Sequence, residues 1–441
     1  MAFLTSSDKA LWHLALPMIF SNITVPLLGL VDTAVIGHLD SPVYLGGVAV
    51  GATATSFLFM LLLFLRMSTT GLTAQAYGAK NPQALARALV QPLLLALGAG
   101  ALIALLRTPI IDLALHIVGG SEAVLEQARR FLEIRWLSAP ASLANLVLLG
   151  WLLGVQYARA PVILLVVGNI LNIVLDVWLV MGLHMNVQGA ALATVIAEYA
   201  TLLIGLLMVR KILKLRRISG EMLKTAWRGN FRRLLALNRD IMLRSLLLQL
   251  CFGAITVLGA RLGSDIIAVN AVLMTLLTFT AYALDGFAYA VEAHSGQAYG
   301  ARDGSQLLDV WRAACRQSGS VALLFSVVYL LAGEHIIALL TSLTQIQQLA
   351  DRYLIWQVIL PLVGVWCYLL DGMFIGATRA AEMRNSMAVA AAGFALTLLT
   401  LPWLGNHGLW LALTVFLALR GLSLAAIWRR HWRNGTWFAA T

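Results

Sequence analysis

The stretch Gln75-Ala-Tyr-Gly-Ala-Lys80 recurs almost unchanged as Gln297-Ala-Tyr-Gly-Ala-Arg302, 222 residues further along the chain. Three other pairs of landmarks keep nearly the same spacing: Gly154 and Gly376, His38-Leu39 and Arg261-Leu262, and Leu14-Ala-Leu16 and Leu235-Ala-Leu237. A single six-residue match can arise by chance. Four landmarks at nearly one offset indicate an internal duplication, and hence two similar structural halves.

The composition around these landmarks is typical of a membrane protein. Of the 441 residues, 60% are hydrophobic and 12% are charged, and the mean hydropathy is +0.85. A soluble domain cannot cover so much apolar surface, whereas a lipid-facing exterior can. The net charge of +11 comes from basic residues between apolar segments, so it indicates membrane topology and no nucleic-acid partner. We also expect no enzyme activity and no metal site, because the sequence has no zinc-ligand pattern and no phosphate loop.

Twelve segments are long enough to cross a bilayer, which takes about 20 mostly apolar residues. They are residues 11–36, 44–66, 85–107, 131–153, 161–182, 188–210, 237–261, 266–290, 309–331, 353–376, 386–404 and 408–428. The predicted fold is therefore an all-α membrane protein with twelve transmembrane helices in two six-helix lobes. Since six is even, both lobes enter the membrane from the same side, which predicts a parallel repeat about a pseudo-twofold axis.

The connections between these segments predict the orientation. The connection 210–235 carries nine Lys and Arg residues, whereas 37–43, 183–187 and 405–407 carry none. Because basic connections stay on the cytoplasmic side, we expect both termini to be cytoplasmic, in a bacterial inner membrane. The connection 108–130 is an exception, because it carries Arg129 and Arg130, but Glu122 and Glu126 accompany them, and we expect an amphipathic helix on the outer surface there.

The basic connection near the middle of the chain also predicts the domains. Residues 1–209 would form an N-terminal six-helix lobe and residues 236–441 a C-terminal one. Residues 210–235 would form a basic cytoplasmic linker, held at the anionic inner leaflet.

Several motifs resemble the multidrug and toxic compound extrusion (MATE) family. They are Leu14-Ala-Leu-Pro17, Val31-Asp-Thr33, the paired Gln-Ala-Tyr-Gly-Ala segments and Gly189-Ala-Ala-Leu-Ala-Thr194. The runs Asn238-Arg-Asp-Ile-Met-Leu-Arg244 and Asp285-Gly286 are similar to its DinF branch. The resemblance covers the whole chain. It implies an antiporter that exports amphipathic or cytotoxic organic compounds by alternating access, coupled to influx of protons or sodium ions.

The same resemblance implies the partners. They would be small amphipathic substrates and membrane lipid, with H+ or Na+ as the coupling ion and no cofactor. We expect a monomer. The competing interpretation is a flippase for a lipid-linked precursor, which needs a basic cavity for a pyrophosphate. Arg244 is nearly alone among the predicted spans, and this argues against the flippase.

Polar residues inside the first-half spans define a candidate coupling site. At about 1.5 Å of rise per residue, Asp32 and Asp176 both reach the outer half of the bilayer, and Asn172 lies one turn before Asp176. The proton site proposed for the family matches Asp32, Asn172, Asp176 and Thr194 residue by residue. Two close carboxylates in a medium of low dielectric constant cannot easily both be charged, so one can hold a proton near neutral pH. The alternative is a hydrogen-bond cluster that only fixes helix packing.

The second half has charges of its own at Asp240, Arg244, Asp285 and Asp371. We interpret them as a second cation site or a gate, since ionisable groups inside a membrane are costly and usually functional. The alternative is that Arg244 neutralises one of the three acids in a structural pair.

Overall fold

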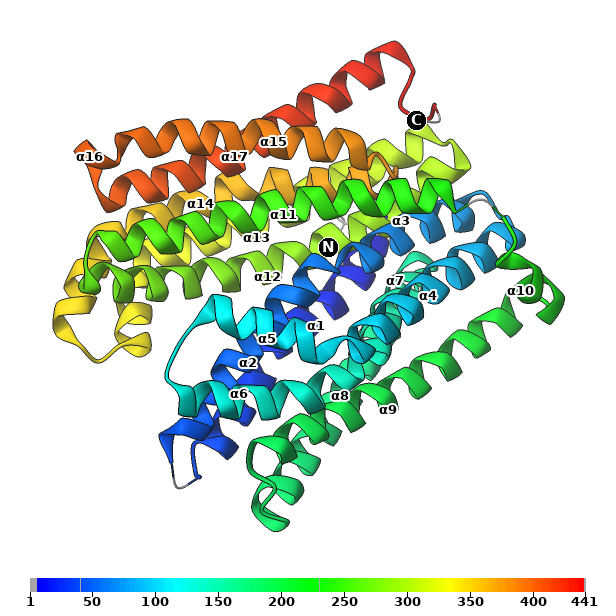
Figure 1. The fold of residues 1–441 in the computed structure, drawn as a ribbon. Coiled ribbons are helices and arrows are strands. Elements are labelled where there is room, and N and C mark those ends of the chain that lie inside the picture. The colour runs from blue at the N-terminus through cyan, green and yellow to red at the C-terminus, as the bar shows by residue number, and fades with distance from the viewer. Residues whose placement is uncertain (1–5, 40, 230, 440–441) are drawn as a thin grey trace. The chain divides into compact units, whose positions relative to one another are not determined.

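The computed structural model describes residues 6–39, 41–229 and 231–439, except for the side chains of residues 24–33. All regular elements of this part of the chain are helices (Figure 1). The first half has α1 (Ser6–Ile36), α2 (Pro42–Leu61), α3 (Phe64–Gly78), α4 (Pro82–Leu105), α5 (Arg107–Val118), α6 (Glu122–Arg135), η1 (Trp136–Ser138), α7 (Ala139–Gly154), α8 (Arg159–Asp176), η2 (Val177–Gly182) and α9 (Asn186–Leu215). The second half follows the short α10 (Gly220–Ala226) and has α11 (Arg232–Arg261), α12 (Ser264–Ala301), α13 (Gly304–Leu340), α14 (Thr344–Gly376), α15 (Ala380–Thr397), η3 (Leu398–Thr400), α16 (Leu401–Leu404) and α17 (Asn406–Asn434).

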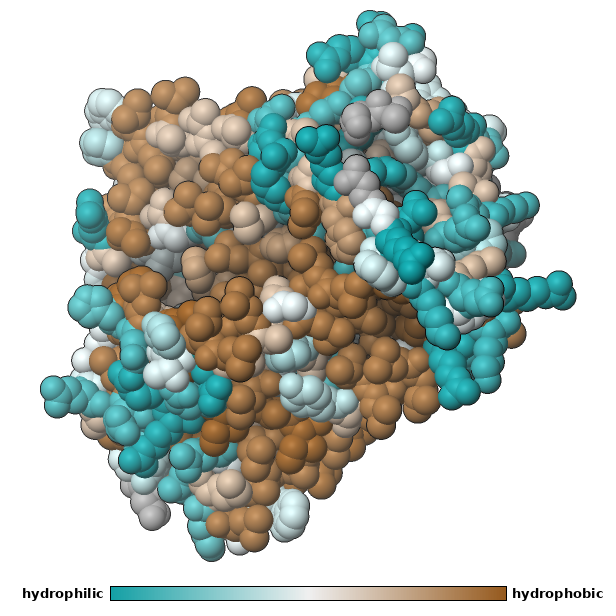
Figure 2. Space-filling model, turned by 45° about the vertical axis from the view of Figure 1, so that its right-hand side comes forward, coloured by the Kyte–Doolittle hydropathy of each residue, from teal (hydrophilic) through white to brown (hydrophobic). Residues whose placement is uncertain are grey.

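The helices confirm the predicted fold class. Eleven helical stretches among the described residues are long and apolar enough to cross a membrane, and α1 covers the remaining predicted span. Many large apolar side chains on these helices are exposed, as expected for surfaces that face lipid. Figure 2 shows them in brown over most of the visible surface, with hydrophilic side chains in teal at its margins.

Two predicted connections are mostly helical. The connection between the predicted spans 44–66 and 85–107 is reduced to residues 79–81, because α3 continues the second span to Gly78 and α4 begins at Pro82. Hydropathy did not reveal α3, since it is rich in polar residues that are nonetheless buried, from Arg66 to Thr70. The connection 108–130 forms α5 and α6, and α6 leads through η1 directly into α7.

The internal repeat extends to the backbone of the turns. Lys80 and Arg302 both take the left-handed conformation, with φ of 54° and 53°. The next residue caps the following helix in each half: the Asn81 side chain accepts from the Ala84 amide at 3.2 Å, and Asp303 accepts from Gln306 at 3.1 Å. Since all these positions differ by 222, the duplication seen in the sequence is also a duplication of structure.

Close helix packing repeats at the same offset. A Cβ atom on Gly150 would lie 2.6 Å from the carbonyl oxygen of Arg66, and one on Gly372 would lie 2.6 Å from that of Ala288. Only glycine lets these backbones approach so closely. The α3–α7 contact of the first half therefore corresponds to the α12–α14 contact of the second.

Contacts divide the chain into two compact units, Ile23–Leu234 and a second made of Leu235–Thr441 with the residues up to Asn22. The first unit has two apolar cores, one of them around Trp136 and Phe131, and the second has a core around Trp410 and Phe416. The division differs from the predicted domains, because the beginning of α1 packs with the second half. There Trp12 stacks on Phe287 of α12 with ring centroids 5.4 Å apart.

Candidate functional site

Asp176 occupies a special position at the end of α8. Its side chain is fully buried, with 0% exposure, and the π-helix η2 begins at the next residue. Single π-helical turns change the register of a helix and are frequent at functional sites. A buried acid in an apolar span is costly, so its place at such a turn favours a functional role.

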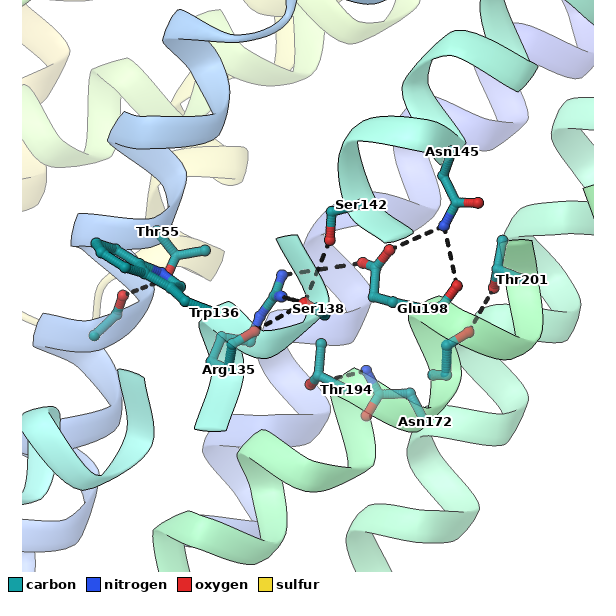
Figure 3. Close-up of polar contacts among 12 residues, drawn as sticks. Thr55, Arg135, Trp136, Ser138, Ser142, Asn145, Asn172, Thr194, Glu198 and Thr201 are labelled. Atoms are coloured by element: carbon teal, nitrogen blue, oxygen red, sulfur yellow. Dashed lines mark hydrogen bonds and ion pairs between the residues drawn. The ribbon is translucent and has the colours of Figure 1, made fainter. Parts of the chain in front are cut away.

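Asn172, one turn before this acid on α8, and Thr194 join α8 to α9 (Figure 3). The Asn172 amide donates to the Thr194 hydroxyl at 3.4 Å, and that hydroxyl donates to the Ala190 carbonyl oxygen at 3.2 Å. Both side chains are buried. The Asn172 Oδ1 atom has no hydrogen-bond partner among the described residues. A buried acceptor of this kind can receive a proton-bearing carboxyl group or a cation.

The fourth predicted member, Asp32, lies on α1, but its side chain is outside the described residues. The structure brings Asn172 and Thr194 into contact and keeps Asp176 on the helix face of Asn172. The assembly of Asp32 with these three residues, and their role in coupling, stay predictions.

A second polar cluster in the first half was missed by the sequence analysis. Glu198 lies on α9, one turn after Thr194, and Figure 3 shows it facing Asn145 and Arg135. The Asn145 amide donates to the Glu198 carboxylate at 3.1 Å, and Arg135 approaches the other oxygen at 4.0 Å. The sequence signal is an acid inside the predicted span 188–210. Like Asp176, an ionisable residue inside a span is a candidate functional residue.

In the second half, Asp371 of α14 is held between two guanidinium groups. Arg244 of α11 donates to its Oδ2 atom at 2.7 Å, and Arg420 of α17 donates to the same atom. All three side chains are buried. Asp285 lies within electrostatic range of this group. The arginine of the predicted set thus neutralises Asp371, which is one of the alternatives stated above.

Asp240 belongs to a different pair. It accepts from Arg384 at 2.5 Å and from Arg239 at 3.3 Å, although it lies only one turn from Arg244 on α11. Of the four residues predicted in this half, Arg244 and Asp371 are therefore in direct contact, and Asp240 has other partners. Arg420 was missed, although it stands inside the predicted span 408–428 and is as conspicuous there as Arg244.

No group of three or more His, Cys, Asp or Glu side chains lies together as a metal site in the part of the chain that was searched, which excludes the Asp32 side chain. The chemistry of the first-half cluster is that of a carboxylate, an amide oxygen and a hydroxyl, the oxygen ligands suited to a proton or a hard cation. In the second-half cluster both arginines already contact Asp371, so this acid is poorly suited to bind an additional cation.

A duplicated helical membrane fold with buried acids is typical of membrane transporters. The family model MatE matches residues 17–178 and 241–404, so the chain belongs to the MatE family of multi-pass membrane transporters. The resemblance to the MATE family and its DinF branch is thereby confirmed.

Individual relatives agree with the family. The chain is 99% identical to "DNA damage-inducible protein F" of Escherichia coli, over all of this chain and 96% of that protein. It is 29% identical to "Probable multidrug resistance protein NorM" of Thermotoga maritima, over 43% of this chain and 42% of that one. A solved multidrug resistance MATE family transporter of the MOP superfamily, in an outward-facing conformation, shares the fold with a TM-score of 0.83 and 21% identity, over 99% of this chain and 98% of that one.

Proposed function

We propose that this transporter is an antiporter that exports amphipathic, cytotoxic organic compounds in exchange for protons or sodium ions. The observation that carries the proposal is the full burial of Asp176, one helical turn after Asn172, whose amide donates to Thr194. A charged acid there is expensive, and binding a proton or a sodium ion removes the cost. Loading and unloading of the ion would then bias the transporter between its outward-open and inward-open states.

The environment follows from the charges at the ends of the spans. Their distribution favours a bacterial inner membrane with both termini in the cytoplasm. The NorM relative and the multidrug MATE structure are described as multidrug transporters, which supports small amphipathic substrates for this chain. The protein would work as a monomer and need no cofactor besides the coupling ion.

The test is substrate transport into inverted membrane vesicles under an imposed pH or sodium gradient. Asp176→Asn should abolish gradient-driven accumulation, because the side chain can no longer change its charge. Asp309→Asn is the matched control, since Asp309 is an exposed acid on α13. Accumulation by Asp176→Asn at the wild-type level would show that this site does not couple transport.

The number of buried arginines bears on the alternative function, a flippase. Arg244 is not alone, because Arg420 is buried beside it. Both guanidinium groups contact Asp371, however, and Asp285 and Glu292 lie nearby, so two positive charges stand against three acids and leave no positive excess. A pyrophosphate needs excess positive charge, so this cluster favours the antiporter. Binding of purified protein to cationic drugs, bile salts and lipid precursors separates the two functions.

A further inference from the structure

A pocket of about 380 Å³ lies between the beginning of α1 and the fourth and fifth turns of α13. Its lining includes Lys9 and Trp12 of α1 and Arg316, Gln317 and Ser320 of α13. It is distant in sequence from the coupling cluster, and the proposed antiport does not use it. Its residues combine positive charge, hydroxyl and indole groups with apolar surface.

Hydrogen bonds build one wall of the pocket. Asp8 is buried and accepts from Arg316 with both carboxylate oxygens, at 2.9 and 3.0 Å. Gln317 donates to the Asp8 carbonyl oxygen at 2.7 Å. These bonds hold α1 against α13 and use only the Nη2 atom of Arg316. Within the described residues, no other side chain uses the remaining donors of this half-exposed guanidinium group, so they are available to a ligand.

The charge of the pocket is positive. Lys9 is exposed and forms no ion pair with the residues that the structure describes. Asp8 offsets one of the two cations, which leaves an excess of about one positive charge. A guanidinium and an ammonium group side by side are the usual partners of a phosphate.

Exposed apolar side chains continue from the pocket along both helices. On α1 they are Leu16 and Phe20, which are 41% and 63% exposed. On α13, Ser320 is followed one turn later by Leu324, which is 61% exposed, and then by Val328 and Leu331. Each face thus changes from charged to polar to apolar within a few turns. This is the polarity profile of a phospholipid, from headgroup to acyl chain.

Trp12 marks the level of this transition. Its ring is partly exposed, and its stacking on Phe287 fixes its orientation. Tryptophan is enriched where apolar and hydrated layers of a membrane meet. The predicted topology puts the beginning of α1 at the inner leaflet, where anionic lipids are concentrated.

We propose that the Lys9–Trp12–Arg316 pocket binds an anionic phospholipid of the inner leaflet. The phosphate lies between Lys9 and Arg316, and the acyl chains cover the exposed apolar residues of α1 and α13. The Ser320 hydroxyl donates to the Arg316 carbonyl oxygen, so it can accept a hydrogen bond from a headgroup hydroxyl. A bound lipid then bridges the two helices that the Asp8–Arg316 ion pair already joins. This inference does not depend on what the transporter exports.

Native mass spectrometry of the full-length protein in detergent tests the site. It is titrated with phosphatidylglycerol and with phosphatidylcholine of the same acyl chains. Lys9→Gln should weaken the tightest phosphatidylglycerol binding about fivefold, the effect of about one charge near a membrane surface, and leave phosphatidylcholine binding unchanged. Lys211→Gln, an exposed lysine at the end of α9, is the control and should bind like the wild type.

Two further measurements separate the whole lipid from its phosphate. Leu324→Gln should weaken phosphatidylglycerol binding, because it interrupts the apolar face, and glycerol phosphate at the lipid's concentration should not displace the lipid. The proposal is overturned if Lys9→Gln binds phosphatidylglycerol like the wild type, or if Lys211→Gln loses as much affinity. Complete displacement by glycerol phosphate would equally overturn it, because the apolar faces would then contribute nothing.

Discussion

The buried acids of the two halves have different surroundings. Asp371 accepts hydrogen bonds from two arginines, whereas Asp176 is fully buried at the end of α8, one turn after Asn172. A carboxylate between two guanidinium groups is fixed in place by its hydrogen bonds. We therefore assign a structural role to Asp371, and the proposed coupling site remains that of the first half, with Asp176.

Arg420→Gln tests the structural role. It leaves Asp371 with one guanidinium partner in a buried site, and breaking such a pair costs about 3–5 kcal/mol. Arg384→Gln is the control, because Arg384 pairs with Asp240 at a partly exposed position and should cost about 1 kcal/mol or less. Thermal unfolding in detergent compares them. Equal losses of stability would contradict a buried, fixed triad.

Glu198 offers a second test at a single residue. Glu198→Gln keeps an acceptor for the Asn145 amide, so we expect a change in stability below about 1 kcal/mol. Glu198→Leu removes that acceptor and should destabilise the protein by about 1–3 kcal/mol. If the glutamine variant is as unstable as the leucine variant in thermal unfolding, the Arg135 contact, and not the Asn145 hydrogen bond, holds this cluster together.

At the scale of the helices, the repeat makes a paired prediction. Gly150→Ala and Gly372→Ala should each destabilise the protein by about 1–3 kcal/mol, because the new Cβ atom meets a carbonyl oxygen of the neighbouring helix. Gly98→Ala and Gly319→Ala are matched controls with nothing within 4 Å of the new atom, and they should stabilise slightly. Melting temperatures of the four variants check this. If only one of Gly150→Ala and Gly372→Ala destabilises the protein, the helix contacts of the two halves are not equivalent.

At the scale of the whole molecule, the sequence predicted the twelve spans and their grouping into two sixes, because hydropathy and the repeated motifs report burial in lipid and duplication directly. It did not predict α3, whose polar run is buried against α7 rather than exposed to water. Nor could it pair Arg420 with Asp371, or place Asp8 against Arg316. Such partners come from helices far apart in the chain, and only the packed structure brings them together.

The most direct test of coupling is to measure how tightly the purified protein binds a substrate-sized lipophilic cation while pH and sodium concentration are varied. An antiporter binds its coupling ion and its substrate in competition. The ion therefore weakens substrate binding by the same factor as the substrate weakens ion binding. The account predicts that the wild-type dissociation constant changes with at least one of the two ions, and that Asp309→Asn behaves the same. Asp176→Asn should bind the cation with an affinity independent of both ions. An unchanged ion dependence in Asp176→Asn would contradict the account.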